Sequence, residues 1–369
     1  MSAIPELMTA VGGQKIKTKE QWETFRRPEI MSLFSEFVYG VRPVERPKDL
    51  SFEVTEEISN YQSENVLFKK INISFSGYSF KVYGYIPENC GGKIPAFVYA
   101  MHEFEEERCD LENSLECEYI DFKEIFKRGY AIFVMPTSGV YPDFENDAKF
   151  KEGVHAVITP DVNDRKDNSW ATISTWAWGL SRVYDYIESL EEFIDLDKVV
   201  VCGHSRGGKT ALWCGATDNR FCGVISNNSG CTGVAMHRTK EGEHIKDINR
   251  TDWFCNNFHK YNDNEDMLPV DQHMLIASIA PRILYVASSS EDSWSDPTAE
   301  RLSLRLAEPA YALYGKEGVK IPDEPVRADI AYHDGTIGYH MKTGPHGITH
   351  YDWKMYLDFM DKKLKGEDK

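Results

Sequence analysis

The sequence lacks the features that would place this chain in a membrane or on a nucleic acid. No apolar run reaches the roughly 18–20 residues that a membrane-spanning helix needs. Lysine and arginine total 42 against 59 acidic residues, which gives a net charge of −17, and no basic cluster occurs. Because phosphate backbones and anionic lipids attract clustered lysine and arginine, neither a nucleic acid nor a membrane is an expected partner.

A targeting segment is also missing. The N-terminal residues have no basic flank followed by an apolar stretch, the pattern of a signal peptide. The eight cysteines include no C-x-x-C pair and no histidine at zinc-ligand spacing, so no metal is expected. A chain of this size does not need disulfides to fold. We therefore expect reduced thiols and a cytoplasmic protein, or a secreted one if a leader has been removed.

Internal repeats, low-complexity tracts and Gly/Ser linkers are absent as well, so residues 1–369 are predicted to form one domain. Hydrophobic residues make up 41% of the chain and aromatic residues 12%, which is enough for a sizeable core. We predict a helix over residues 20–39. Antiparallel strands are predicted at 51–59, 66–75 and 80–86, where β-branched and aromatic residues alternate with polar ones.

The pattern then changes to short apolar runs followed by helical stretches, which is typical of a parallel sheet covered by helices on both faces. Strands are expected at 96–101, 131–135, 198–203, 222–226, 283–288 and 329–333, and helices at 119–127, 171–190, 206–216, 297–313 and 350–363. The predicted fold class is α/β, a three-layer sandwich with a mostly parallel sheet and antiparallel N-terminal strands.

The most informative segment is the G-x-S-x-G pentapeptide Gly203-His204-Ser205-Arg206-Gly207. An apolar strand ends before it and a helix-compatible run begins at Arg206, which is the strand–turn–helix setting of the nucleophilic serine in α/β-hydrolases. A helix N-terminus also favours developing negative charge. We predict Ser205 as a nucleophile. The alternative is a glycine-rich turn with a capping serine.

A nucleophilic serine needs a base, which in this fold comes from a loop after the last strand. His346 lies in a Gly- and Pro-containing loop just before the final helix, at the sheet edge where the serine is expected. We therefore predict His346 as the base. Other histidines in this part of the chain are His333, His340 and His350.

The base in turn needs a carboxylate that orients it. The loop after the 283–288 strand offers Glu291, Asp292 and Asp296. Asp292 lies at the right distance past the strand to turn back toward His346 and is the predicted acid. The other two carboxylates stay open as alternatives.

Two cations follow the serine. Arg206 is its neighbour, and Lys209 lies one helical turn on, at i+3 from Arg206. Cations are unfavourable at the positive end of a helix dipole, so their position suggests a use. They can donate charged hydrogen bonds to a tetrahedral oxyanion or to an acidic substrate. Further N–H groups for an oxyanion are expected near residues 102–104.

These residues carry a resemblance to a known family. The segment GHSRGGKTALWCGATDNRF resembles the G-[CH]-S-R-x-G-K signature of the glucuronoyl esterases, carbohydrate esterase family 15, and neighbouring segments are similar from about 168 to 363. The resemblance implies an α/β-hydrolase that cleaves esters of 4-O-methyl-glucuronic acid on xylan with no metal or organic cofactor. It implies Ser205 as nucleophile, His346 as base and Arg206 as oxyanion ligand. Lys209, Glu243 and Trp294 would then bind the sugar.

The sequence departs from the family at one position. Many members carry the triad acid as a glutamate where this chain has Asn228, and an amide cannot act as a carboxylate. Some bacterial members instead carry an acid two residues before the tryptophan, which here is Asp292. The resemblance and the strand order therefore indicate the same acid.

The predicted function is hydrolysis of a small-molecule or oligosaccharide ester, with a glucuronate ester favoured by the cations and Glu243. An acetyl xylan esterase or oligosaccharide deacetylase is the alternative, since imported acetylated oligosaccharides are handled in the cytosol. A non-catalytic binding protein of the same fold is a third hypothesis. It is suggested by Asn228, which replaces the usual acid of the family.

Overall fold

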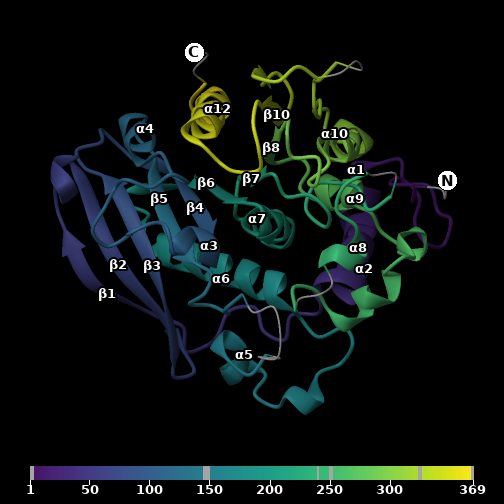
Figure 1. The fold of residues 1–369 in the computed structure, drawn as a ribbon, viewed down its shortest axis with the longest axis horizontal. Helices are drawn as coiled ribbons and strands as arrows, with labels where there is room; N and C mark the ends of the chain where they lie inside the picture. The colour runs from purple at the N-terminus through teal and green to yellow at the C-terminus, as the bar shows by residue number, and fades with distance from the viewer. Residues whose placement is uncertain (1–3, 144–149, 239–240, 249–251, 323–325, 367–369) are drawn as a thin grey trace.

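The computed structural model describes residues 4–143, 150–238, 241–248, 252–322 and 326–366. Within these ranges, ten strands form one sheet in the order β1-β2-β3-β5-β4-β6-β7-β8-β10-β9 (Figure 1). The strands are β1 (Ser51–Ile58), β2 (Val66–Phe75), β3 (Tyr78–Pro87), β4 (Ile94–Met101), β5 (Ala131–Pro136), β6 (Ile194–His204), β7 (Gly223–Asn227), β8 (Ile283–Ser289), β9 (Ile330–Tyr332) and β10 (Ile337–Lys342).

Strands β5, β4, β6, β7, β8 and β10 run parallel, and β1, β2 and β3 extend the sheet as antiparallel strands. The predicted α/β fold with a mostly parallel sheet and antiparallel N-terminal strands is therefore confirmed. The helices are α1 (Lys19–Gln21), α2 (Arg27–Phe34), α3 (Glu103–Glu106), α4 (Phe122–Lys127), α5 (Gly153–Ile158), α6 (Thr172–Ile187), α7 (Arg206–Thr217), α8 (Ile245–Ile248), α9 (Gln272–Ala277), α10 (Pro297–Leu306), α11 (Glu308–Ala312) and α12 (His350–Met360). Turns of π-helix join α1 to α2 and extend this helical segment to residue 39.

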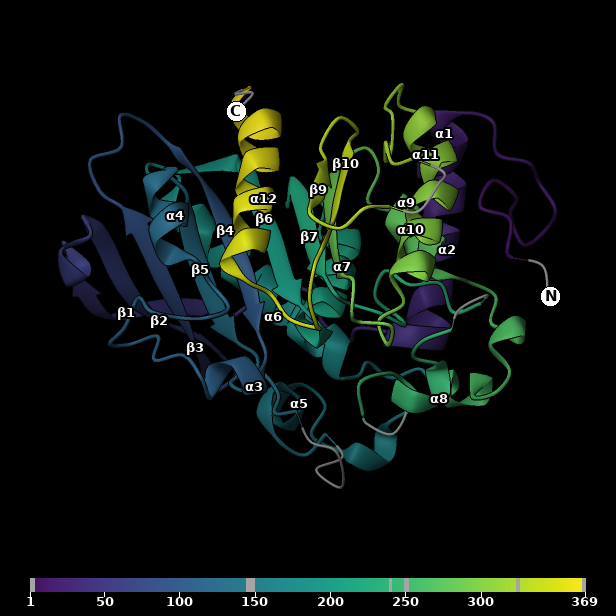
Figure 2. The same cartoon turned by 45° about the horizontal axis from the view of Figure 1, so that its top comes forward.

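Helices cover both faces of the parallel strands because successive side chains of a strand point to opposite faces. On β4, Ala96 and Val98 belong to the core that includes α2, α6, α7 and α9, whereas Phe97 and Tyr99 belong to the core beneath α4 and α12. Figure 2 shows α12 and α4 together on one side of the sheet, with α6 and α7 on the other. Two apolar faces explain why these strands are continuous apolar runs in the sequence.

The prediction for the last strand was wrong in one respect. The expected 329–333 segment contributes only β9, a short antiparallel edge strand, and the final parallel strand is β10. β10 contains His340 and Lys342, which interrupt the apolar pattern. Both side chains are buried because each has partners: His340 Nε2 donates to Asp352 Oδ1 at 2.8 Å, and Lys342 Nζ donates to Ser289 Oγ at 2.5 Å.

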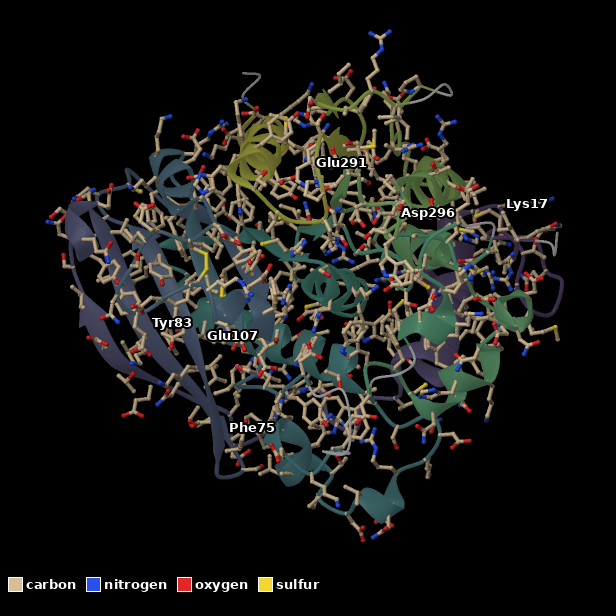
Figure 3. The ribbon with its side chains drawn as sticks, in the orientation of Figure 1. Lys17, Phe75, Tyr83, Glu107, Glu291 and Asp296 are labelled. Atoms are coloured by element: carbon tan, nitrogen blue, oxygen red, sulfur yellow. A yellow bond between two sulfur atoms is a disulfide. The ribbon has the colours of Figure 1, made fainter. Side chains whose placement is uncertain are left out.

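The expectation of reduced thiols was also wrong for two cysteines. Cys109 and Cys117 form a disulfide, and the other six are free (Figure 3). The spacing of Cys109 and Cys117 matches no disulfide motif, so no local pattern predicts this bond. Disulfides persist in oxidising compartments, and the cytoplasmic expectation is therefore not supported. In the described ranges, no helix has the length and apolarity needed to cross a bilayer.

Alkylation before and after reduction tests the disulfide. In unfolded protein that has not been reduced, we expect six of the eight cysteines to be alkylated, and peptide mass spectrometry should find Cys109 and Cys117 linked. Alkylation of all eight thiols without reductant would contradict the bond. The Cys109→Ser/Cys117→Ser double variant is the control and should give six alkylated thiols under both conditions.

Candidate active site

Ser205 occupies a strained turn between β6 and α7. Its backbone has φ 55° and ψ −123°, a conformation that non-glycine residues rarely adopt. The flanking glycines allow the turn, because a Cβ on Gly203 would collide with the Gly207 carbonyl oxygen and one on Gly207 would lie 2.6 Å from the Ala100 carbonyl oxygen. The Ser205 N–H donates to the Asn227 carbonyl at 2.9 Å, which ties the turn to β7. The predicted strand–turn–helix geometry is present.

His346 and Asp292 meet at the same edge of the sheet. His346 Nδ1 donates to Asp292 Oδ2 at 2.6 Å. The rings of His346 and His204 have centroids 4.7 Å apart, so the imidazole lies beside the residue that precedes Ser205. The His346 side chain is 42% exposed and Asp292 only 4%. A buried carboxylate that holds a more exposed imidazole is the arrangement of a catalytic base and its orienting acid.

Asp292 is held as a carboxylate. Burial alone would raise its pKa, but hydrogen bonds from His346, Ser295 and Asn228 outweigh burial and hold the pKa well below its usual range. The Asn228 amide donates to Asp292 Oδ2 at 2.9 Å, and the Ser295 N–H donates to Oδ1 at 3.1 Å. Asn228 therefore helps to keep the predicted acid, Asp292, ionised.

The alternative acids have other contacts. Glu291 is exposed, and its N–H donates to the Gly344 carbonyl. Asp296 caps α10 through the Ala299 N–H at 2.9 Å (Figure 3). Among the alternative histidines, His340 is fully buried against Asp352, His333 hydrogen-bonds the Tyr285 hydroxyl at 2.8 Å, and His350 is exposed at the start of α12.

Lys209, Glu243 and Trp294 form one connected group. Lys209 is buried, and its Nζ donates to the Ser229 and Cys231 carbonyls at 2.7 and 2.5 Å and to Glu243 Oε2 at 3.1 Å. Trp294 Nε1 donates to Glu243 Oε1 at 3.2 Å, while its ring is 55% exposed. The structure thus brings the three predicted sugar-binding residues together.

Arg206 lies at the N-terminus of α7 with a carboxylate that the sequence analysis missed. Its Nη1 forms an ion pair with Asp143, and its guanidinium lies 4.9 Å from the centroid of the Trp253 ring. Trp253 Nε1 also donates to Asp143 Oδ1 at 2.8 Å. No local pattern could reveal these partners, because Asp143 follows β5 and Trp253 precedes α9.

A cluster of buried polar side chains surrounds His204, the residue that precedes Ser205. Glu105 Oε1 accepts from the Tyr99 hydroxyl at 2.9 Å and lies 3.0 Å from His204 Nδ1. Burial raises the pKa of Glu105 and lowers that of His204, and for His102 burial with the Arg206 charge lowers the pKa to about 3. Both histidines are therefore neutral beside His346. The ligating atoms of His102, Glu105 and His204 lie within 4.8 Å of one another, but the contacts of Glu105 are accounted for without an ion.

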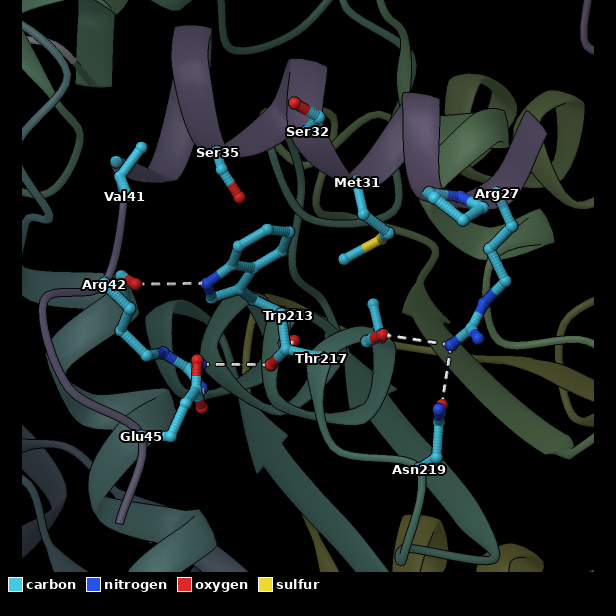
Figure 4. A pocket seen from close by; sticks show the side chains of 14 residues that line it. Arg27, Met31, Ser32, Ser35, Val41, Arg42, Glu45, Trp213, Thr217 and Asn219 are labelled. Carbon is cyan, nitrogen blue, oxygen red and sulfur yellow. Dashed lines mark hydrogen bonds and ion pairs between the residues drawn. The ribbon is translucent and has the colours of Figure 1, made fainter. Parts of the chain in front are cut away.

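A separate cavity of about 400 Å³ lies between α2 and the far end of α7 (Figure 4). Ala216 and Thr217 line it, eleven and twelve residues after Ser205, so these two residues lie about 17 Å from Ser205 along the helix. Its arginines are occupied: Arg27 donates to Ser278 O and Asn219 Oδ1, and Arg42 donates to Thr217 Oγ1. These hydrogen bonds hold elements together and point to no reaction.

The fold and the site together define a serine carboxylic-ester hydrolase with an α/β-hydrolase fold. A family model described as "Glucuronyl esterase, fungi" matches residues 164–315. The carbohydrate esterase MZ0003 from an unknown prokaryotic organism is 32% identical over 98% of this chain and 90% of its own length. The 4-O-methyl-glucuronoyl methylesterase of Schizophyllum commune is 25% identical over 100% of this chain and 84% of its own.

Solved structures of related esterases support the same family. A glucuronoyl esterase from Solibacter usitatus superposes with a TM-score of 0.89 at 30% identity and 98% coverage of both chains. A promiscuous CE15 esterase from a marine bacterial metagenome gives 0.86 at 32% identity, over 98% of this chain and 97% of its own. The chain therefore belongs to the glucuronoyl esterase family, carbohydrate esterase family 15. The acetyl xylan esterase alternative is not favoured by these comparisons.

Replacement of Asp292 tests the acid. In Asp292→Asn the amide can orient His346 in the wrong tautomer, and we expect kcat to fall by about 10²- to 10⁴-fold with a folded protein. Glu291→Gln is the matched control, because it removes an exposed carboxylate from the adjacent position, and its kcat should stay within about twofold. Steady-state kinetics on an ester substrate measure both. Equal activity of Asp292→Asn and wild type would exclude Asp292.

The lowered pKa of Asp292 also predicts a pH-dependent stability. A carboxyl whose pKa is lower in the folded state stabilises the fold above its unfolded pKa of about 3.9, and this contribution is lost as the pH falls through the folded value. Urea unfolding of wild type and Asp292→Asn should therefore show a difference that is steady from pH 7 to pH 5 and shrinks at lower pH. A difference that grows on acidification would contradict this assignment.

Proposed function

We propose that this chain hydrolyses esters of 4-O-methyl-glucuronic acid on xylan, with Ser205, His346 and Asp292 as the catalytic triad. The observation that carries the proposal is the 2.6 Å hydrogen bond between His346 and Asp292 beside the Ser205 turn. The names of the related 4-O-methyl-glucuronoyl methylesterases support the substrate class.

In the proposed reaction, Ser205 Oγ attacks the carbonyl carbon of the uronate ester while His346 Nε2 takes its proton. Asp292 holds the imidazole by accepting from Nδ1–H and stabilises the imidazolium that forms. The negative charge that develops on the carbonyl oxygen is stabilised by Arg206 and by the N-terminus of α7. His346 then protonates the leaving alcohol, and water hydrolyses the acyl-enzyme by the same steps in reverse order.

Substrate recognition is proposed for Lys209, Glu243 and Trp294. Glu243 can accept hydrogen bonds from sugar hydroxyls. Lys209 Nζ donates to two backbone carbonyls and can turn its third N–H from Glu243 to a sugar hydroxyl. The exposed ring of Trp294 offers an apolar face for the sugar ring. The substrate is thus a small-molecule or oligosaccharide ester.

We also propose that the enzyme works in an oxidising compartment. The support is the Cys109–Cys117 disulfide, since reducing compartments rarely keep such bonds.

Kinetics of Ser205→Ala test the nucleophile and the substrate together. We expect hydrolysis of benzyl glucuronate to fall by more than about 10³-fold, because the covalent route is lost, while circular dichroism stays native. Initial rates of the wild type on methyl glucuronate and acetylated xylobiose then report specificity. A preference for the acetate by more than about tenfold would overturn the uronate assignment, and unchanged activity of Ser205→Ala would exclude the nucleophile.

A further inference from the structure

Three segments that are distant in the sequence converge on the guanidinium of Arg206. Arg206 is the first residue of α7, Asp143 follows β5, and Trp253 lies between β7 and α9. Asp143 accepts from Arg206 Nη1 and, through its other oxygen, from Trp253 Nε1 at 2.8 Å. The Asp143 N–H donates to Glu103 Oε2 at 3.2 Å, which fixes the carboxylate-bearing residue to α3. Asp143 is therefore held from three directions.

This arrangement offsets an electrostatic cost. A cation at a helix N-terminus faces the positive end of the helix dipole. The side chain of Asp143 is only 5% exposed, so its charge is weakly screened and acts strongly on the guanidinium. The Trp253 ring adds a cation–π contact at 4.9 Å. Together the carboxylate and the indole keep Arg206 at a position where it would otherwise be repelled.

The pairing leaves the buried Nε–H of Arg206 without a partner in the described part of the chain. Among the described residues, Nε of Arg206 is buried and has no hydrogen-bond partner, although Nη1 is occupied by Asp143. A buried N–H without a partner is costly. A group that enters the site can supply the partner, and the donor belongs to the residue that directly follows Ser205.

We infer that Asp143 and Trp253 are positioning residues that fix the Arg206 guanidinium so that its Nε–H is directed at the oxyanion formed on Ser205. This inference rests on the proposed roles of Ser205 and Arg206 and adds the residues that make Arg206 effective. Asp143 does not touch the reacting atoms. It fixes the direction of the donor, because an ion-paired guanidinium has fewer rotamers to lose when the transition state forms.

A double-mutant cycle tests the inference. Asp143→Asn keeps the size of the side chain but removes the charge, and we expect kcat to fall by about ten- to a hundredfold with KM within about twofold. In the Arg206→Ala background, the same replacement should change kcat by less than about twofold, because the group it positions is gone. Trp253→Phe keeps the ring but removes the N–H, and it should have a smaller effect of the same kind.

A control variant and a second readout make failure of this inference distinguishable from failure of the proposed function. Asp167→Asn removes an exposed carboxylate that pairs with Lys260, outside the site, and should leave kcat unchanged. The labelling rate of Ser205 by a fluorophosphonate gives a second cycle that needs no uronate, since phosphonylation also develops charge on an oxygen. If the wild type is labelled but does not hydrolyse glucuronate esters, the proposed function fails while this cycle can still be read.

Two results would overturn the inference. One is an equal loss of kcat on Asp143→Asn in wild type and in Arg206→Ala, which would indicate that Asp143 acts independently of Arg206. The other is a fall in thermal stability with unchanged kcat and labelling rate, which would indicate a purely structural ion pair. Partial recovery of kcat by Asp143→Glu, which restores the charge on a longer side chain, would support the positioning role.

Discussion

The close approach of α7 to the ends of β4 and β6 is the constraint on which the site depends. Gly203 and Gly207 permit this approach, since a side chain at either position would meet a backbone carbonyl. Ser205 must then take a positive φ, and the hydrogen bond from its N–H to Asn227 holds that conformation. Because Ser205 and the first turn of α7 are fixed by backbone contacts, Arg206 and Lys209 are also fixed relative to the proposed nucleophile. The positions of the side chains in the site are therefore set by the packing of the backbone.

The loop that carries His346 is anchored at both ends by buried polar groups. Before it, Lys342 Nζ donates to the carbonyl of Pro345 at 2.9 Å. After it, Asp352 Oδ2 accepts from the N–H and the hydroxyl of Thr349, both at 2.7 Å, and Asp352 Oδ1 accepts from His340. A half-exposed histidine can keep one direction only if the backbone beneath it is held. These contacts explain why charged residues occur in the core of β10 and α12, where a polar group without a partner would destabilise the fold.

The sequence predicted the elements whose local pattern is self-sufficient, namely the parallel strands up to β8, the helices α4, α6 and α7 and the turn at Ser205, but not α8 and α9 between β7 and β8. It failed at β10, because the burial of His340 depends on Asp352, a partner in the next helix. The same reason applies within the site. Sequence order was enough to predict that Asp292 and His346 lie together, but Asp143 and the Cys109–Cys117 bond depend on contacts between segments that no spacing encodes. Local patterns therefore predicted the turn at Ser205 and the place of His346 beside it, and tertiary contacts supply what holds the two residues in position.

Asn228 shows how the position of the proposed acid and its neighbour are linked. A carboxylate at residue 228 would lie against Asp292, since the Asn228 amide already approaches Asp292 Oδ2 to 2.9 Å. Two carboxylates at that distance in a buried site raise the pKa of one of them, and the protonated one could no longer orient the imidazole as an anion. With an amide at 228, the same contact becomes a donated hydrogen bond that helps to keep Asp292 ionised. The amide at one strand end and the carboxylate at the next are therefore complementary, and an amide at residue 228 suits the proposed role of Asp292.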